Sequence, residues 1–149
     1  MSEEQLYQGL GVAPGIAIGT AYVRETGGLE IPERSIRKAD VKLERARLRK
    51  AVILAQRQVR RLQSRAKTMS GASSEELGFL LEAYQQMLNN SRLVRGADAR
   101  IKDERINAEA AVQREILEIT ATFQAMDDAY ISARLEDIRE VGNRVIRNL

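Results

Sequence analysis

Apolar residues recur at alternating steps of three and four in separate stretches of this 149-residue chain. The clearest stretch closes the sequence, and its apolar positions are Ile131, Leu135, Ile138, Gly142, Val145 and Leu149. This spacing places them on one face of a helix, which must pack against other helices to be buried. Gly142 lies within that face although it costs about 1 kcal/mol of helix propensity relative to Ala. Its position therefore predicts a close approach by a neighbouring helix.

Earlier stretches with the same spacing offer the packing partners. A long helix is expected from Asp40, its predicted N-cap, to about Met69, and a Ser within residues 70–74 is expected to cap the next. Residues 89–91 interrupt this second helix, a short helix follows, and Asn107 is the predicted N-cap of another. Asp127 or Asp128 is expected to cap the last. The predicted buried faces of these helices are Leu48, Val52, Ala55, Val59, Leu62, Ala66 and Met69; Leu77, Leu81, Tyr84 and Leu88; Leu93, Val94, Ala97 and Ile101; and Val112, Ile116, Ile119, Phe123 and Met126.

The amino-terminal residues have a different character. Glycines punctuate a run of Val, Ile, Ala and Tyr, which predicts two short β-strands near Leu6–Leu10 and Ile16–Val23. Two strands form only a marginal sheet by themselves, so we expect them to pair with a further segment. The predicted fold class is therefore mainly α: a four-helix bundle of two helical hairpins, the second helix interrupted, with two short N-terminal β-strands. A low aromatic content, 4%, agrees with a helical bundle.

The charged residues are distributed unevenly along the chain. Thirteen Lys or Arg residues lie from Arg34 to Lys67, opposed only by Asp40 and Glu44, whereas the segment 103–140 is rich in Asp and Glu. The favoured interpretation is a basic helix that lies beside acidic helices. A nucleic-acid-binding helix is the alternative, but no aromatic residues alternate with the basic ones to stack on bases. Nucleic acid is therefore an unlikely partner.

The residue types present exclude several kinds of chemistry. The chain has no His and no Cys, so it lacks the commonest general base, thiolate metal ligands and any phosphohistidine. We expect no catalytic residue, no metal site and no cofactor in this chain. No apolar run is long enough to cross a membrane, and the N-terminus is acidic rather than signal-like. A cytoplasmic protein is predicted.

The second helix carries the strongest sign of a binding function. Leu77, Leu81, Tyr84 and Leu88 form the stripe suited to the core, and further apolar residues lie off that stripe. A helix in a bundle buries only part of its circumference, so some of this surface could be exposed and bind a partner. A bent helix that buries both sides is the alternative.

Four segments together resemble one protein family. They are residues 11–19 (GVAPGIAIG), 81–88 (LEAYQQML), 107–112 (NAEAAV) and 127–148 (DDAYISARLEDIREVGNRVIRN). In this order they resemble the N-terminal part of Enzyme I, the phosphoenolpyruvate–protein phosphotransferase of the bacterial phosphotransferase system. The resemblance implies leading β-strands of an incomplete α/β phosphohistidine subdomain in residues 1–33 and a helical subdomain that docks the phosphocarrier HPr in residues 34–149. The family's active-site His and its Mg-binding barrel would lie outside this chain, which should be inactive by itself.

The resemblance also implies which residues contact the carrier. They are Glu75, Glu76, Leu80, Glu82, Tyr84, Met87, Leu88 and Arg134. Two departures from the family pattern are evident: Tyr84 stands where many members have His, and Asn89, Asn90 and Ser91 replace an acidic run. These changes make an HPr-like carrier of the nitrogen-related branch plausible beside HPr itself. The remaining domains of the full-length enzyme are the other expected partners.

Overall fold

The computed structural model describes residues 16, 18–20, 31–68, 71–124 and 129–149. The predicted strand at Leu6–Leu10 and the caps at Asp127 and Asp128 lie outside these residues, as do Met69 and Met126. Most of the predicted strand Ile16–Val23 also lies outside them. Its described residues, 16 and 18–20, are not in a strand, and Ile16 and Ile18 are almost fully exposed.

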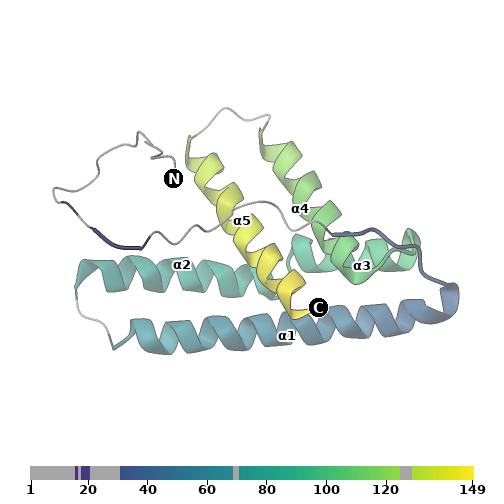
Figure 1. Ribbon diagram of the computed structural model, residues 1–149, viewed down its shortest axis with the longest axis horizontal. Helices are drawn as coiled ribbons and strands as arrows, with labels where there is room; N and C mark the ends of the chain where they lie inside the picture. The colour runs from purple at the N-terminus through teal and green to yellow at the C-terminus, as the bar shows by residue number, and fades with distance from the viewer. Residues whose placement is uncertain (1–15, 17, 21–30, 69–70, 125–128) are drawn as a thin grey trace, which may run out of the picture.

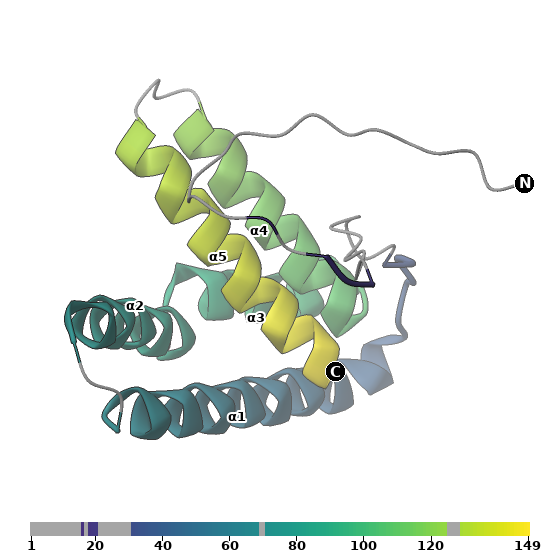
Figure 2. The same cartoon turned by 60° about the vertical axis from the view of Figure 1, so that its left-hand side comes forward.

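The described part of the chain is mainly helical, as the sequence predicts. A short 3-10 helix, η1 (Lys38–Asp40), leads into the helices α1 (Val41–Ala66), α2 (Ala72–Leu88), α3 (Arg92–Asp103), α4 (Ala108–Gln124) and α5 (Ala129–Asn148). Helices α1 and α2 lie side by side, and the pair of α4 and α5 crosses them at a steep angle (Figures 1 and 2). Helix α3 packs mainly on α4, and α5 packs on both α4 and α1. The two expected hairpins are therefore α1 with α2–α3, and α4 with α5.

The helices bury the faces that their apolar spacing predicts. The core contains Leu48, Val52, Ala55, Val59 and Ala66 of α1, Leu81, Tyr84 and Leu88 of α2, Leu93, Ala97 and Ile101 of α3, Val112, Ile116 and Ile119 of α4, and Val141 and Val145 of α5. Leu62 is an exception, because 36% of it is exposed where α1 extends towards its C-terminal end. The predicted interruption of the second helix is also confirmed: α2 ends at Leu88, and Asn90 adopts a positive φ of 53° before α3 begins.

Gly142 lies where α4 and α5 approach each other closely, as predicted. A Cβ atom built on Gly142 would overlap Ile116 Cδ1 and lie 2.7 Å from Ile116 Cγ1. Gly96 of α3 has the same role against α4, where an added Cβ would overlap the carboxylate of Glu115. Each glycine therefore lets a bulky or charged side chain of α4 occupy the space beside its backbone.

The predicted side-chain caps of α1 and α2 do not form. Asp40 precedes α1, yet its carboxylate accepts hydrogen bonds from the guanidinium of Arg37 at 2.7 and 3.1 Å. No Ser caps α2, whose N-cap is Gly71, and Ser74 Oγ instead donates to the carbonyl of Ala66 at 2.8 Å. Polar side chains at helix starts have other backbone and charged partners within reach, and here those partners win.

Asn107 precedes α4 but binds the chain segment that enters the bundle. Its Oδ1 accepts a hydrogen bond from the Arg34 amide at 2.8 Å, and its Nδ2 donates to the Pro32 carbonyl at 3.2 Å. An isolated antiparallel bridge between Ser35 and Ile106 continues this contact. The free amide of Ala108 donates instead to Glu44 Oε2 of α1, at 2.9 Å. A carboxylate from another helix thus satisfies the start of α4.

The basic segment is paired with acidic residues only in part. Arg45 forms a bidentate pair with Asp98 of α3, and Arg47 bridges Glu44 to Glu109 of α4. Arg37 pairs locally with Asp40. These three are the members of the thirteen-residue basic segment that form ion pairs with described residues. The predicted position beside acidic helices is confirmed by the packing of α1 on α5 and α4, although only a minority of the basic residues pair with acidic ones.

Candidate docking surface

The outward face of α2 is acidic with one large apolar side chain at its centre. Glu75, Phe79, Glu82 and Gln86 follow each other at steps of four, three and four, and all are exposed. Phe79 has 73% of its surface exposed. Glu75 lies in the first turn of α2, where a negative charge is favoured by the helix dipole. We call Glu75, Glu76, Phe79, Leu80, Glu82 and Met87 the docking surface.

The residues implied by the family resemblance divide into a surface set and a buried set. Glu75, Glu76 and Glu82 are exposed, and Leu80 and Met87 are partly buried at one flank of α2. Tyr84 and Leu88 lie in the core, with 9% and 0% of their surfaces exposed. The expectation that Leu88 offers an apolar contact is therefore wrong in this structure, because its position on α2 points into the bundle. Because Tyr84 is buried, it can influence the docking surface mainly through the residues that it contacts, such as Asp137.

Tyr84 connects α2 to the predicted site residue on α5. Its hydroxyl donates a long hydrogen bond of 3.4 Å to Asp137 Oδ1, and Arg134 donates to Asp137 Oδ2 at 3.2 Å. Asp137 thus links the buried Tyr84 to the exposed Arg134. Burial of Tyr84, with the nearby carboxylates of Asp137 and Glu140, raises the pKa of its hydroxyl to about 12. The phenol therefore stays protonated at neutral pH and can donate this long hydrogen bond from α2 to α5.

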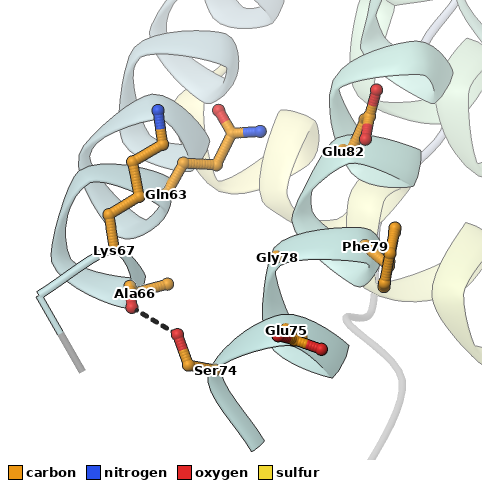
Figure 3. Close-up of a pocket in the computed structure, with 8 residues that line it drawn as sticks. All are labelled: Gln63, Ala66, Lys67, Ser74, Glu75, Gly78, Phe79 and Glu82. Carbon is orange, nitrogen blue, oxygen red and sulfur yellow. Dashed lines mark hydrogen bonds between the residues drawn. The ribbon is translucent and has the colours of Figure 1, made fainter. Parts of the chain in front are cut away.

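An open cavity borders the docking surface on the side of α1. Its volume is about 460 Å³, and it lies where the C-terminal end of α1 and the first turns of α2 separate. Figure 3 shows Gln63, Ala66 and Lys67 on one side and Gly78 and Glu82 on the other. Gly78 has nothing within 4 Å of the place where a Cβ would lie. The small residues Ala66 and Gly78 therefore leave room beside Phe79 for a partner's side chain.

Phe79 is not among the residues that the family resemblance implies, although it lies at the centre of the exposed face of α2. The sequence signal was available, because Phe79 does not belong to the stripe formed by Leu77, Leu81, Tyr84 and Leu88. A large aromatic residue on the polar side of an amphipathic helix is a common feature of partner-binding surfaces.

The described residues include neither a metal-binding cluster nor a membrane-spanning helix. Among them, no group of three or more His, Cys, Asp or Glu residues could hold a metal ion. No helix in the described ranges is long and apolar enough to cross a bilayer. Several ionised groups form networks that join helices to each other, such as Glu115 with Arg100 and Arg92.

Comparison with known proteins gives a consistent result. A family model described as "PEP-utilising enzyme, N-terminal" matches residues 8–134. The chain is 34% identical over 146 residues to the phosphoenolpyruvate-protein phosphotransferase of Geobacillus stearothermophilus, and this match covers 98% of the chain and 24% of that protein. It is 29% identical to the protein of that description from Cupriavidus necator, with 95% and 24% coverage. The chain thus spans about a quarter of the length of these relatives.

Two solved structures resemble the fold. A solution structure of Enzyme I (nEIt) superposes with a TM-score of 0.73 at 28% identity and covers 80% of this chain and 47% of that one. The N-terminal domain of Enzyme 1 – Nitrogen superposes with a TM-score of 0.69 at 28% identity, covering 80% and 48%.

Proposed function

This chain belongs to the family of PEP-utilising enzymes, in their N-terminal part, and we propose that its docking surface on α2 binds an HPr-like phosphocarrier protein. The single observation that carries the proposal is Phe79, 73% exposed on α2 with Glu75 and Glu82 one turn away on either side. Burying this side chain against a partner would gain about 2 kcal/mol. This available gain at the centre of a charged face supports the proposal that a partner covers the face.

The charges around Phe79 specify the partner's chemistry. Glu75, Glu76 and Glu82 are exposed, and no ion pair within the described residues neutralises them. A carrier that fits must present an apolar patch ringed by Lys or Arg residues. Such complementary charges mainly increase the association rate and fix the orientation, whereas the apolar anchor slows dissociation.

The role of the complex would be to position the carrier. The chain contains no His, so a phosphohistidine that donates the phosphoryl group would have to be carried outside these 149 residues. We propose that residues 34–149 form the docking subdomain and that residues 1–33 belong to an α/β subdomain that carries this group. The transfer itself would then depend on how the docked carrier faces that subdomain.

The carrier could be HPr or its nitrogen-branch paralogue, and the structure suggests where they would be distinguished. The α2–α3 connection of Asn89, Asn90 and Ser91 is uncharged, so the acidic part of the surface ends at Glu82. A carrier whose basic residues cluster opposite the N-terminal half of α2 fits better than one that needs charge along the whole helix.

An NMR titration with each carrier at moderate salt tests the proposal. We expect shifts at the docking surface and at Arg134 with one carrier, and Phe79→Ala should weaken its binding at least about 10-fold. Leu117→Ala is the matched control, because Leu117 lies on α4 and is also highly exposed, at 61%. It should change the affinity less than about twofold. Tyr84→Ala is a poorer probe, since it would open a cavity in the core.

The proposal would be wrong if both substitutions had equal effects, or if neither carrier shifted resonances of α2. Glu75→Gln combined with Glu76→Gln gives a second readout. It should slow association and reduce the salt dependence of binding while dissociation changes little.

A further inference from the structure

The outward face of α1 is strongly basic along most of the helix. Six exposed side chains form it: Arg49, Lys50, Arg57, Arg60, Arg61 and Arg65. We call these six residues the basic face. Helix α1 lies along one edge of the molecule in both views (Figures 1 and 2). At 1.5 Å per residue the basic face extends about 24 Å along this edge.

The side chains of the basic face have no partners within the described part of the chain. None of the six forms an ion pair or donates a side-chain hydrogen bond there. The arginines of α4 and α5 differ, since Arg114, Arg139, Arg144 and Arg147 each pair with a Glu. The cations of the basic face therefore lack ion pairs within the described residues, unlike these arginines of α4 and α5.

Most of α1 lacks the acidic residues that normally lie near basic residues on a surface helix. From residue 45 to residue 74 there is no Asp or Glu. Arg57, Arg61 and Arg65 instead follow each other at i, i+4 spacing, where like charges repel and destabilise a helix. A polyanion bound along this face would remove that repulsion.

We infer that the basic face of α1 binds the phosphate backbone of a nucleic-acid duplex, without reading its sequence, which reverses the expectation from the sequence that nucleic acid is an unlikely partner. Five of the six side chains are Arg, whose planar guanidinium donates two hydrogen bonds to one phosphate. Successive cations lie on one straight, continuous helix, which can follow a groove or a phosphate strand. This surface shares no residue with the docking surface, although Arg60 and Gln86 line one open pocket between α1 and α2.

The composition of the face distinguishes a duplex from other anionic partners. It carries no aromatic residue, so it cannot stack on the bases of a single strand. Ile53, 47% exposed, is a small apolar contribution compared with the core of a protein interface or the apolar face of a membrane-binding helix. Contacts to phosphates need neither stacking nor an apolar anchor.

Fluorescence anisotropy with a labelled 24-base-pair DNA duplex tests this inference on the whole chain. If about four of the six cations contact phosphates, the association constant should fall roughly 100-fold between 50 and 200 mM salt. The triple variant Arg57→Glu, Arg60→Glu, Arg61→Glu should bind at least about 10-fold more weakly than the wild type at 50 mM salt.

A matched control separates the basic face from net charge. Lys38→Glu, Arg95→Glu, Lys102→Glu changes the net charge by the same amount at exposed positions that lack ion pairs within the described residues. This control should bind within about threefold of the wild type, and circular dichroism should show both variants folded. Equal losses in the two variants, no binding by the wild type at 50 mM salt, or equally tight binding to poly-glutamate or to vesicles with anionic lipid would each overturn the inference.

Discussion

Gly142→Ala tests how closely α4 and α5 approach each other. Alanine would gain about 1 kcal/mol of helix propensity over glycine if the site were open. In the structure the new Cβ would overlap Ile116 Cδ1 and lie 2.7 Å from Ile116 Cγ1. Ile116 is 6% exposed and branched at Cβ, so its Cγ1 cannot move away without a change of χ1 in a packed core. Overpacking of this kind costs about 1 to 3 kcal/mol.

The two contributions have opposite signs, and the steric one should win. We expect Gly142→Ala to lower the free energy of unfolding by about 1 kcal/mol, measured by urea denaturation followed by circular dichroism at 222 nm. Gly78→Ala is the matched control, because Gly78 also lies inside a helix but has open space around it. It should raise the free energy of unfolding by up to about 1 kcal/mol.

A second substitution identifies the clashing atom. Ile116→Val removes Cδ1, the nearer of the two Ile116 atoms, and should itself cost about 1 kcal/mol. In that background Gly142→Ala should become less destabilising by at least about 0.5 kcal/mol. A stabilising effect of Gly142→Ala equal to that of Gly78→Ala, or strict additivity with Ile116→Val, would refute the close approach of the two helices.

Two further predictions concern ionisation. Burial opposes ionisation of Glu109, but hydrogen bonds from Arg47 and Asn107 lower its pKa below its ordinary value of 4.5. The ionised carboxylate therefore stabilises the folded state above pH 4.5, and this contribution is lost as the pH falls further. Urea denaturation at pH 5 and pH 3 should show a smaller loss for Glu109→Gln than for the wild type, and equal losses would contradict this account. Ultraviolet titration at 295 nm should show a tyrosine with a midpoint near pH 12. Tyr84→Phe should abolish it, and should reduce the loss of stability between pH 10 and pH 12, because a raised pKa favours the folded state only while the phenol is protonated.

Apolar spacing predicted most of the helical fold, because burial of one helix face depends on residues close in sequence. The faces of α1, α3 and α4 were correct almost residue by residue, and Gly142 correctly indicated a close contact. Side-chain caps were not predictable in this way. Asp40 pairs with the nearby Arg37. Asn107 instead binds the segment 31–36, and the amide of Ala108 binds Glu44. These last two contacts join segments that are far apart in the sequence.

The candidate site stays a prediction, and the structure shows only which of its residues are exposed. The family resemblance placed it on α2, and Glu75, Glu76 and Glu82 are exposed there. It also included Leu88, because a motif conserves a residue's position without stating which way it points, and it passed over Phe79. The sequence predicted that the basic helix lies beside acidic helices, but only the packing of α3 and α4 determines which of its arginines reach an acid.

The way the bundle is held at one end has a mechanical consequence. Residues 31–36 are fixed to residues 105–107, and Arg47 donates to the carbonyl of Leu149 at 2.9 Å, so both segments are tethered near the beginning of α1. The docking surface begins beside the other end of that helix, roughly 30 Å away at 1.5 Å per residue. If the bundle turned as one rigid body about the tethered end, a rotation of about 10° would move a partner bound at the docking surface by about 5 Å over that length. Such a rotation would change no contact within the docking surface.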